Sequence, residues 1–273
     1  MKKYILLIII VFILSGCGAS PSRNFELKTN VLKIQEKSAQ IVENKTEFRK
    51  YLPILMFHYI EEISSKSADQ MRYRLSFPPE KLEQFLIFFK EHHVETLTFW
   101  DLKDAIEGKK QLPQKSVILT FDDGYLDHYK NAFQMLKKYN MKGVFFIISK
   151  KPGLDANYAT WEQLKEMAEN GQEIASHTVS HLDLTTLSDK RIIYELATSK
   201  KTIEEKIGKP VITLCYPAGK YDDRAIKIAS DNYLFARTTK WGQYFSLDKK
   251  YEIPTIRIAP TTNMGLLRSL YKK

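Results

Sequence analysis

Cysteine is scarce in this chain of 273 residues, which contains only Cys17 and Cys215. Two cysteines exclude a disulfide framework and a four-cysteine zinc site. Long hydrophobic runs are also missing. The one continuous apolar run, from Tyr4 to Leu14, is too short for a membrane-spanning helix, which excludes a polytopic membrane protein. Neither GxGxxG nor GxxxxGK[ST] occurs, so nucleotide binding has no support.

The composition is that of an ordinary globular protein, with 44% hydrophobic and 27% charged residues, which argues against a mainly disordered chain. The formal net charge is +10. A basic exported protein attracts anionic lipids and anionic wall polymers. The basic residues are spread along the sequence rather than concentrated in one motif, so nucleic acid is not an expected partner. We expect a monomer.

The N-terminus has the pattern of an export signal, with a basic start, the apolar run and then Leu14-Ser15-Gly16-Cys17. The small residues before Cys17 resemble the lipobox of bacterial lipoproteins. This resemblance predicts a signal peptide over 1–16 and a lipid anchor on Cys17, with the protein held at the outer side of the cell membrane. Cleavage would remove Lys2 and Lys3 and lower the net charge to +8. The alternative is a plain signal peptide with an incidental cysteine.

Residues 17–50 are predicted to form a polar tether, helical or partly ordered. They are mostly polar and place one apolar residue in each heptad, which is too few for a coiled coil. A single folded domain is then predicted over residues 51–273.

Short apolar runs alternate with helical patterns from Tyr51 onward. This alternation predicts a parallel sheet with helices outside, either doubly wound or closed as a barrel. Strands are expected at Pro53–His58, Ser116–Phe121, Gly143–Ile148, Gln172–Ser176, Pro210–Tyr216, Tyr233–Ala236 and Glu252–Ile258. Helices are expected at Pro79–His92, Tyr125–Tyr139, Thr160–Asn170, Ser188–Ile207 and Asp222–Asn232, with Gly171 and Gly208 as C-caps of two of them.

Three polar clusters follow expected strands, where parallel α/β folds collect their reactive groups. The first is Thr120-Phe121-Asp122-Asp123-Gly124. Two adjacent carboxylates repel each other unless a cation or hydrogen bonds offset the cost. Asp-Gly is also common in turns, so this motif alone leaves catalysis and a plain turn equally open.

The second cluster is His177-Thr178-Val179-Ser180-His181. Histidines at i and i+4 share one face of a helical turn and can bind one metal ion. With Asp123 they supply two imidazoles and a carboxylate, which leaves coordination positions for water and substrate. Chance HxxxH pairs are not rare, and a non-haem iron oxygenase would use the same ligand types.

The third cluster is Leu214-Cys215-Tyr216-Pro217-Ala218-Gly219. Proline and glycine fix a bend here, and a bend can aim a backbone N–H into a site as an oxyanion donor. Such turns are common, so this signal is weak by itself.

The three motifs in this order resemble the NodB-type polysaccharide deacetylases, carbohydrate esterase family 4. The resemblance implies a distorted (β/α) barrel of fewer than eight regular units and removal of N-acetyl groups from an extracellular polysaccharide. It also implies Asp122 as general base, with Asp123, His177 and His181 binding a divalent metal, most often Zn²⁺, with Co²⁺ or Ni²⁺ as alternatives. The N–H of Ala218, beside Tyr216 and Pro217, is implied as the oxyanion donor.

Two residues of the family pattern are missing. The third motif normally carries an arginine where this chain has Cys215, and Arg257 is our candidate for orienting the base instead. The family also usually places its general acid in a C-terminal Leu-x-His, but no histidine follows His181.

His58, at the end of an apolar run before the first motif, is the candidate replacement for the acid. The first and last strands of a closed barrel are neighbours, so the acid can move between them. The branch that deacetylates poly-β-1,6-N-acetylglucosamine resembles this layout. A depressed pKa for the base and a raised pKa for the histidine are expected. The alternative is a structural strand-end histidine. His92, His93 and His128 have helical surface settings and are left out.

Poly-β-1,6-N-acetylglucosamine is thus the favoured substrate, and peptidoglycan is the alternative within the family. An inactive carbohydrate-binding lipoprotein is the alternative of another class, which the Cys215 substitution would suit. Aromatic residues considered for stacking on sugar rings are Tyr125, Trp161, Tyr216 and Trp241.

Overall fold

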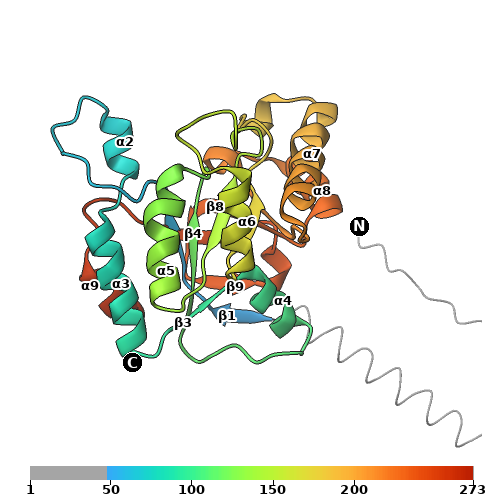
Figure 1. The fold of residues 1–273 in the computed structure, drawn as a ribbon. Coiled ribbons are helices and arrows are strands. Elements are labelled where there is room, and N and C mark those ends of the chain that lie inside the picture. Colours follow the sequence, from blue (N-terminus) through green and yellow to red (C-terminus); the bar gives the residue numbers. More distant parts are fainter. Residues whose placement is uncertain (1–47, 273) are drawn as a thin grey trace, which may run out of the picture. The chain divides into compact units, whose positions relative to one another are not determined.

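Seven parallel strands close into a barrel at the centre of the protein (Figure 1), in a computed structural model that describes residues 48–272. Their order around the barrel is β2, β10, β8, β7, β6, β5 and β4, and β2 pairs with β4 to close it. A further short strand, β3, pairs with β4. The bounds are β2 Ile54–Phe57, β3 Glu95–Leu97, β4 Ser116–Phe121, β5 Val144–Ile147, β6 Glu173–Ser176, β7 Thr213–Cys215, β8 Phe235–Trp241 and β10 Ile253–Arg257. The predicted (β/α) barrel is confirmed.

Helices cover the outside of the barrel, and those predicted from the sequence are present. Thr160 begins α6 with a reciprocal capping box, and Gly208 ends α7 in the left-handed conformation that suits glycine. The bounds are α2 Gln70–Leu75, α3 Pro79–Glu91, α4 Phe99–Ile106, α5 Gln134–Lys138, α6 Trp161–Glu169, α7 Asp189–Ile207, α8 Asp223–Asn232 and α9 Met264–Leu270. A π-helical turn, η1 (His128–Phe133), precedes α5.

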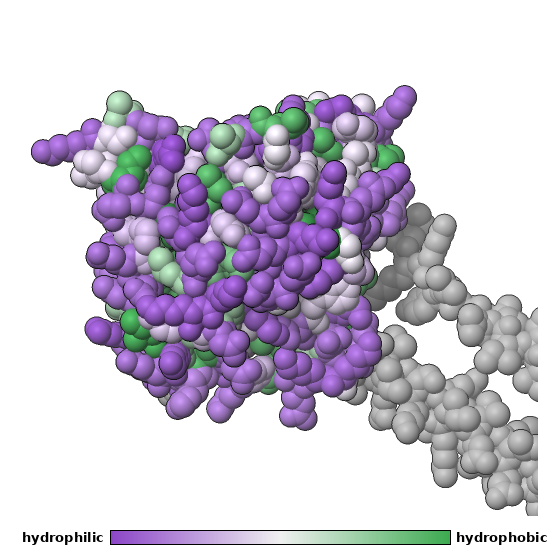
Figure 2. All heavy atoms as spheres, viewed as in Figure 1, coloured by the Kyte–Doolittle hydropathy of each residue, from purple (hydrophilic) through white to green (hydrophobic). Residues whose placement is uncertain are grey.

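Apolar side chains form two clusters. One lies between the barrel and its helices, and the other joins the opposite face of the strands, with Ile54, Ile118 and Phe146, to α4. Every residue of β2, β4, β5 and β6 is buried, which explains why β2, β4 and β5 are mostly apolar in sequence rather than alternating. On the face shown in Figure 2, hydrophilic residues predominate and hydrophobic ones form small scattered patches.

Arg49 and Lys50, which the predicted tether includes, lie in a strand of the described structure. This strand, β1 (Arg49–Tyr51), forms an additional antiparallel pair with β9 (Tyr244–Ser246). The predictions for the signal peptide, Cys17 and residues 17–47 lie outside the described residues. Among the residues that are described, no helix is both long and apolar enough to cross a membrane.

One buried carboxyl group lies at the opposite end of the barrel from the strand ends considered below. Glu173, the first residue of β6, accepts hydrogen bonds from the N–H of Phe99 (2.7 Å) and the hydroxyl of Thr213 (3.0 Å). Burial raises the pKa of Glu173 from 4.5 to about 7, although these donors oppose the shift.

The stability of the protein should therefore depend on pH through Glu173. Between pH 4.5 and about 7 the folded state keeps a proton that the unfolded chain releases, so this contribution is complete below that window and is lost as the pH rises through it. The loss is at most about 3 kcal/mol. In urea unfolding at several pH values, Glu173→Gln should flatten the slope relative to the wild type. Glu80→Gln, at an exposed position, should leave the slope unchanged. Parallel curves for the wild type and Glu173→Gln would contradict the assignment.

Candidate active site

A cavity of about 460 Å³ lies at the carboxyl ends of the barrel strands and brings together most of the predicted site residues. His58 follows β2, the pair Asp122 and Asp123 follows β4, and His177 and His181 follow β6. Tyr216 and Ala218 follow β7, and Arg257 ends β10. Pairing of β2 with β10, which places Met56 beside Arg257, confirms that the first and last strands are neighbours.

Three side chains in this cavity converge as the ligands of one metal ion would. Asp123 Oδ1 lies 3.4 Å from His177 Nε2 and 3.5 Å from His181 Nε2. Two donor atoms at tetrahedral positions ~2.1 Å from a zinc ion are ~3.4 Å apart. The donor set also matches catalytic zinc sites, which use three protein ligands and keep a position open. The residues present therefore fit a divalent metal.

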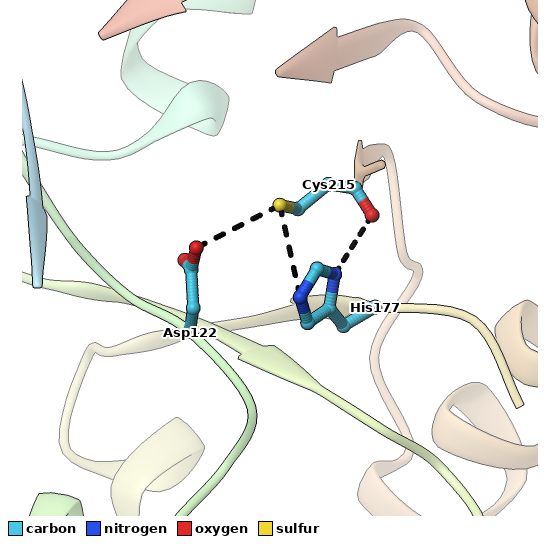
Figure 3. Close-up of side chains that lie close together, drawn as sticks. All are labelled: Asp122, His177 and Cys215. Carbon is cyan, nitrogen blue, oxygen red and sulfur yellow. Dashed lines mark hydrogen bonds between the residues drawn. The ribbon is translucent and has the colours of Figure 1, made fainter. Parts of the chain in front are cut away.

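The orientation of His177 supports the same conclusion. Its Nδ1 donates a hydrogen bond to the carbonyl oxygen of Cys215 at 2.8 Å (Figure 3). This bond places the ring proton on Nδ1 and leaves Nε2 as the lone-pair donor facing Asp123. Metal-binding histidines are commonly held by such a second bond to a carbonyl.

The predicted helical turn over His177–His181 is wrong. The segment is a loop in which Thr178 and His181 have φ values of 65° and 56°. Left-handed conformations are costly for a buried β-branched residue and cluster at functional sites. The loop is held instead by a bond within it, from the His181 N–H to the Thr178 hydroxyl, and by one to α7, from the Ser180 N–H to Glu195.

We expect the purified protein to bind one divalent cation per chain at Asp123, His177 and His181. His181→Ala should remove one of three ligands and lower metal content measured by elemental analysis, while His92→Ala, at an exposed histidine on the end of α3, should retain it. Equal metal content in the two variants would contradict the assignment.

Asp122, the predicted general base, is buried and paired with a cation that was not among the predicted site residues. The guanidinium of Arg237 on β8 donates to Asp122 Oδ1 and also to the sulfur of Cys215, the latter at 2.9 Å. Arg237 is itself fully buried. Arg257, the predicted partner, is exposed and, within the described residues, makes no ion pair with Asp122.

The correction from Arg257 to Arg237 has a simple topological reason. In the parallel pairing of β7 with β8, Cys215 lies directly beside Arg237. The arginine therefore lies on β8, the strand next to the one that carries it in the family motif, and the small side chain of Cys215 leaves room for it. Figure 3 shows the Cys215 sulfur between Asp122 and His177. The sulfur lies 3.9 Å from Asp122 Oδ2 and 4.0 Å from His177 Nε2.

The electrostatic surroundings keep both aspartates ionised. Burial alone would raise the pKa of Asp122, but Arg237, helped by His58 and His177, outweighs burial, and the pKa is lowered. Burial would also raise the pKa of Asp123. The hydrogen bond from His177, together with the charges of His177, His58 and His181, outweighs burial and lowers the pKa. The predicted depressed pKa of the base agrees with this arrangement.

His58 lies beside the base, with its Nε2 3.8 Å from Asp122 Oδ2. Burial lowers the pKa of His58, and the attraction of Asp122 and Asp123 offsets only part of that shift. The pKa of His58 is thus shifted in the direction opposite to the predicted rise. The geometry still places an imidazole and an ionised carboxylate at one cavity.

The predicted bend is present at Pro217–Gly219, and the oxyanion role of the Ala218 N–H stays a prediction. Ala218 lines the cavity with φ 50°, while the N–H groups of Gly219 and Lys220 close the turn on Tyr216 and Pro217. Gly219 cannot be replaced without strain, because its φ is +69° and a Cβ there would lie 2.1 Å from the Thr239 hydroxyl.

The aromatic candidates for sugar stacking divide into two groups. Tyr125 and Tyr216 line the cavity, whereas Trp161 packs against the core and Trp241 is exposed on the outer wall. His128 was expected on the surface, but it is buried, with 1% of its surface exposed, so that expectation is wrong. His92 and His93 are exposed as expected.

Comparison with known proteins identifies the family. A profile of the family named polysaccharide deacetylase matches residues 109–234. YxkH of Bacillus subtilis, named for the same family, is 34% identical over 217 residues, covering 79% of this chain and 74% of its own length. Poly-β-1,6-N-acetyl-D-glucosamine N-deacetylase of Staphylococcus aureus is 28% identical over 229 residues, covering 76% and 72%.

A solved structure gives the same result. Deacetylase PplD of Streptococcus pyogenes, determined in complex with acetate, superposes with a TM-score of 0.76 at 29% identity, over 84% of this chain and 100% of that one. Together with the confirmed barrel and its convergent carboxylates and histidines, these similarities show that the chain belongs to the polysaccharide deacetylase family.

Proposed function

We propose that the protein is a metal-dependent hydrolase that removes N-acetyl groups from N-acetylglucosamine units of an extracellular polysaccharide. One observation carries the proposal: a three-residue ligand set, a buried ionised carboxylate and an imidazole all face one cavity. Asp123, His177 and His181 would hold the metal. When bound, a divalent cation supplies Lewis acidity to the acetamide carbonyl and to the attacking water.

Asp122 acts as the general base. Its lowered pKa keeps it ionised, and Arg237 fixes one of its oxygens, so Oδ2 is left to take a proton from the attacking water. The new bond joins the water oxygen to the acetamide carbon. The N–H of Ala218 donates to the carbonyl oxygen as negative charge develops there.

His58 acts as the general acid. An amine leaves an amide carbon only after it gains a proton, and His58 Nε2 is directed into the cavity beside Asp122. Cleavage of the carbon–nitrogen bond then gives acetate and a glucosamine unit. To act as the acid, His58 has to carry a proton when the amine leaves; Asp122 and Asp123 favour that charged form, whereas burial opposes it.

Poly-β-1,6-N-acetylglucosamine is the proposed substrate. Relatives from Staphylococcus aureus and Escherichia coli carry the name of that activity, the latter 27% identical over 192 residues. The chain spans only 27% of the Escherichia coli relative's length, so nothing beyond that relative's named activity is transferred to this chain. An acid placed before the first motif, at His58, agrees with this branch.

A panel of glycans tests the substrate proposal. Acetate release should be fastest from poly-β-1,6-N-acetylglucosamine and its oligomers and slow from peptidoglycan. The reverse order would replace the first substrate by the second. Binding of either glycan without acetate release from metal-loaded protein would favour the inactive carbohydrate-binding alternative.

We also propose that the protein is lipid-anchored through Cys17. Cys17→Ala should leave the protein unlipidated and move it from the membrane fraction to the medium, because a basic surface alone binds membranes weakly at physiological salt. Cell fractionation with immunoblotting measures this, with Cys215→Ala as the matched cysteine control. Full membrane retention of Cys17→Ala would point to an uncleaved apolar segment or a protein partner instead.

A further inference from the structure

Three side chains in η1 and just before it hold the backbone that carries His58. Asp127 Oδ1 accepts a hydrogen bond from the N–H of Ile60 at 3.0 Å. Asn131 donates its amide to the carbonyl of Ile60 at 2.7 Å, and the imidazole of His128 bonds the carbonyl of His58 at 2.5 Å. We call these three residues, in the sequence Asp127-His128-x-x-Asn131, the η1 clamp.

The clamp holds the backbone just beyond the end of strand β2, where the sheet no longer holds it. Strand β2 ends at Phe57, so His58 lies just beyond the last residue held in the barrel ladder. The backbone of Tyr59 is bonded to Leu75 and Phe77, outside the barrel. The bonds of the clamp therefore fix the positions on either side of Tyr59, including His58 itself.

His128 is the central member of the clamp. It is buried against Phe121 and Phe145, with ring centroids 5.7 Å and 6.0 Å away. A carbonyl oxygen only accepts, so Nε2 must donate, and Nδ1 then has no partner within the described residues. An unpaired buried nitrogen costs about 1–3 kcal/mol, which a phenyl ring would avoid in this apolar setting. The imidazole is thus explained by its bond to His58 rather than by packing.

We propose that His128 is a positioning residue that, with Asp127 and Asn131, holds His58 at the distance from Asp122 that general-acid catalysis requires. The clamp begins three residues after Gly124, so it links the relocated acid to the element that carries the base and a metal ligand. The π-helical turn is consistent with this role, because such turns often occur at functional sites. This inference rests on the proposed function.

Three variants test the proposal. His128→Phe keeps the ring volume and removes the donor, and His128→Gln can restore a donor near the position of Nε2. His92→Phe is the matched control. His92 also bonds a backbone carbonyl, that of Phe88, but it lies at the end of α3 and does not line the cavity. Each variant is assayed for release of acetate from a chitooligosaccharide or poly-β-1,6-N-acetylglucosamine oligomer and from an activated aryl acetate.

We expect His128→Phe to lower kcat for the amide by about 10–100-fold, since small misplacements of catalytic groups have effects of this size. The aryl acetate needs no protonated leaving group, so its hydrolysis should fall by less than about 3-fold. His128→Gln should recover most of the amide rate, and His92→Phe should behave as the wild type. A merely structural role would lower both rates alike.

A double variant separates this proposal from the proposed function. Combined with His58→Ala, His128→Phe should add almost no further loss of amide turnover, because both act through one group. Additive losses, equal losses on both substrates or an unaffected amide rate would overturn the clamp. Undiminished amide turnover in His58→Ala alone would instead overturn the general-acid assignment. If His128→Phe does not fold, Asn131→Leu provides the same comparison through the Ile60 carbonyl.

Discussion

Replacing His58 with alanine should lower acetate release from an N-acetylated glycan by roughly 10²–10⁴-fold, the usual contribution of a general acid. The side chain lies in the cavity 3.8 Å from Asp122 and is not a member of the proposed ligand set, so the fold and metal content should be retained. Hydrolysis of an activated aryl acetate should fall far less, because its leaving group departs without a proton.

The comparison of the two substrates makes this result specific. His93→Ala, at an exposed histidine outside the cavity, is the control and should keep both activities. If His58→Ala released acetate from the amide at the wild-type rate, the acid would have to be another group. If both substrates lost activity equally, His58 would have a structural or metal-related role.

Replacing Arg237 with methionine should be comparably damaging, because it leaves the buried carboxylate of Asp122 without its cation. Breaking one partner of a buried ion pair costs about 3–5 kcal/mol of stability when the other stays charged. Otherwise the pKa of Asp122 rises and the base is protonated near neutral pH. We expect a loss of roughly 10²-fold or more at neutral pH, with partial recovery as the pH rises and Asp122 ionises.

Exchanging Cys215 and Arg237 tests by rescue whether Asp122 needs a neighbouring cation. Cys215 and Arg237 are paired across β7 and β8, so Cys215→Arg with Arg237→Cys returns the cation to the family's usual position. The double variant should regain at least about tenfold over Arg237→Cys alone. Arg257→Met, which removes an exposed cation at the same cavity, should have a much smaller effect. Wild-type rates in Arg237→Met would show that the base needs no partner.

The sequence predicted those parts of the fold that depend on local pattern. Buried parallel strands are continuous apolar runs, so Ser116–Phe121 was predicted to the residue. The short pair of β1 with β9 has no such pattern, since its strands are three residues long and largely exposed or half-buried. The motifs likewise predicted that Asp122, Asp123, His177 and His181 lie together, because the strand ends meet at one edge of the barrel.

The residues that support the site could not be predicted, because each acts through pairing that the sequence does not display. Arg237 follows an apolar run that was expected to end at Ala236, and only the register beside Cys215 reveals its role. His128 lies in a helical pattern with charged neighbours, but the π-helical turn directs it inward. The loop at His177–His181 departs from a helix because its left-handed residues are stabilised by distant bonds, such as that from Ser180 to Glu195.

The most direct test of the central claim is acetate release from poly-β-1,6-N-acetylglucosamine by purified protein before chelation, after chelation and after addition of Zn²⁺, Co²⁺ or Ni²⁺. We expect release by the loaded protein, loss on chelation and recovery with metal, all absent in Asp122→Asn, which should still bind the ion. Full activity in a demetallated sample, or no acetate release from any N-acetylglucosamine polymer by protein shown to contain metal, would contradict the account.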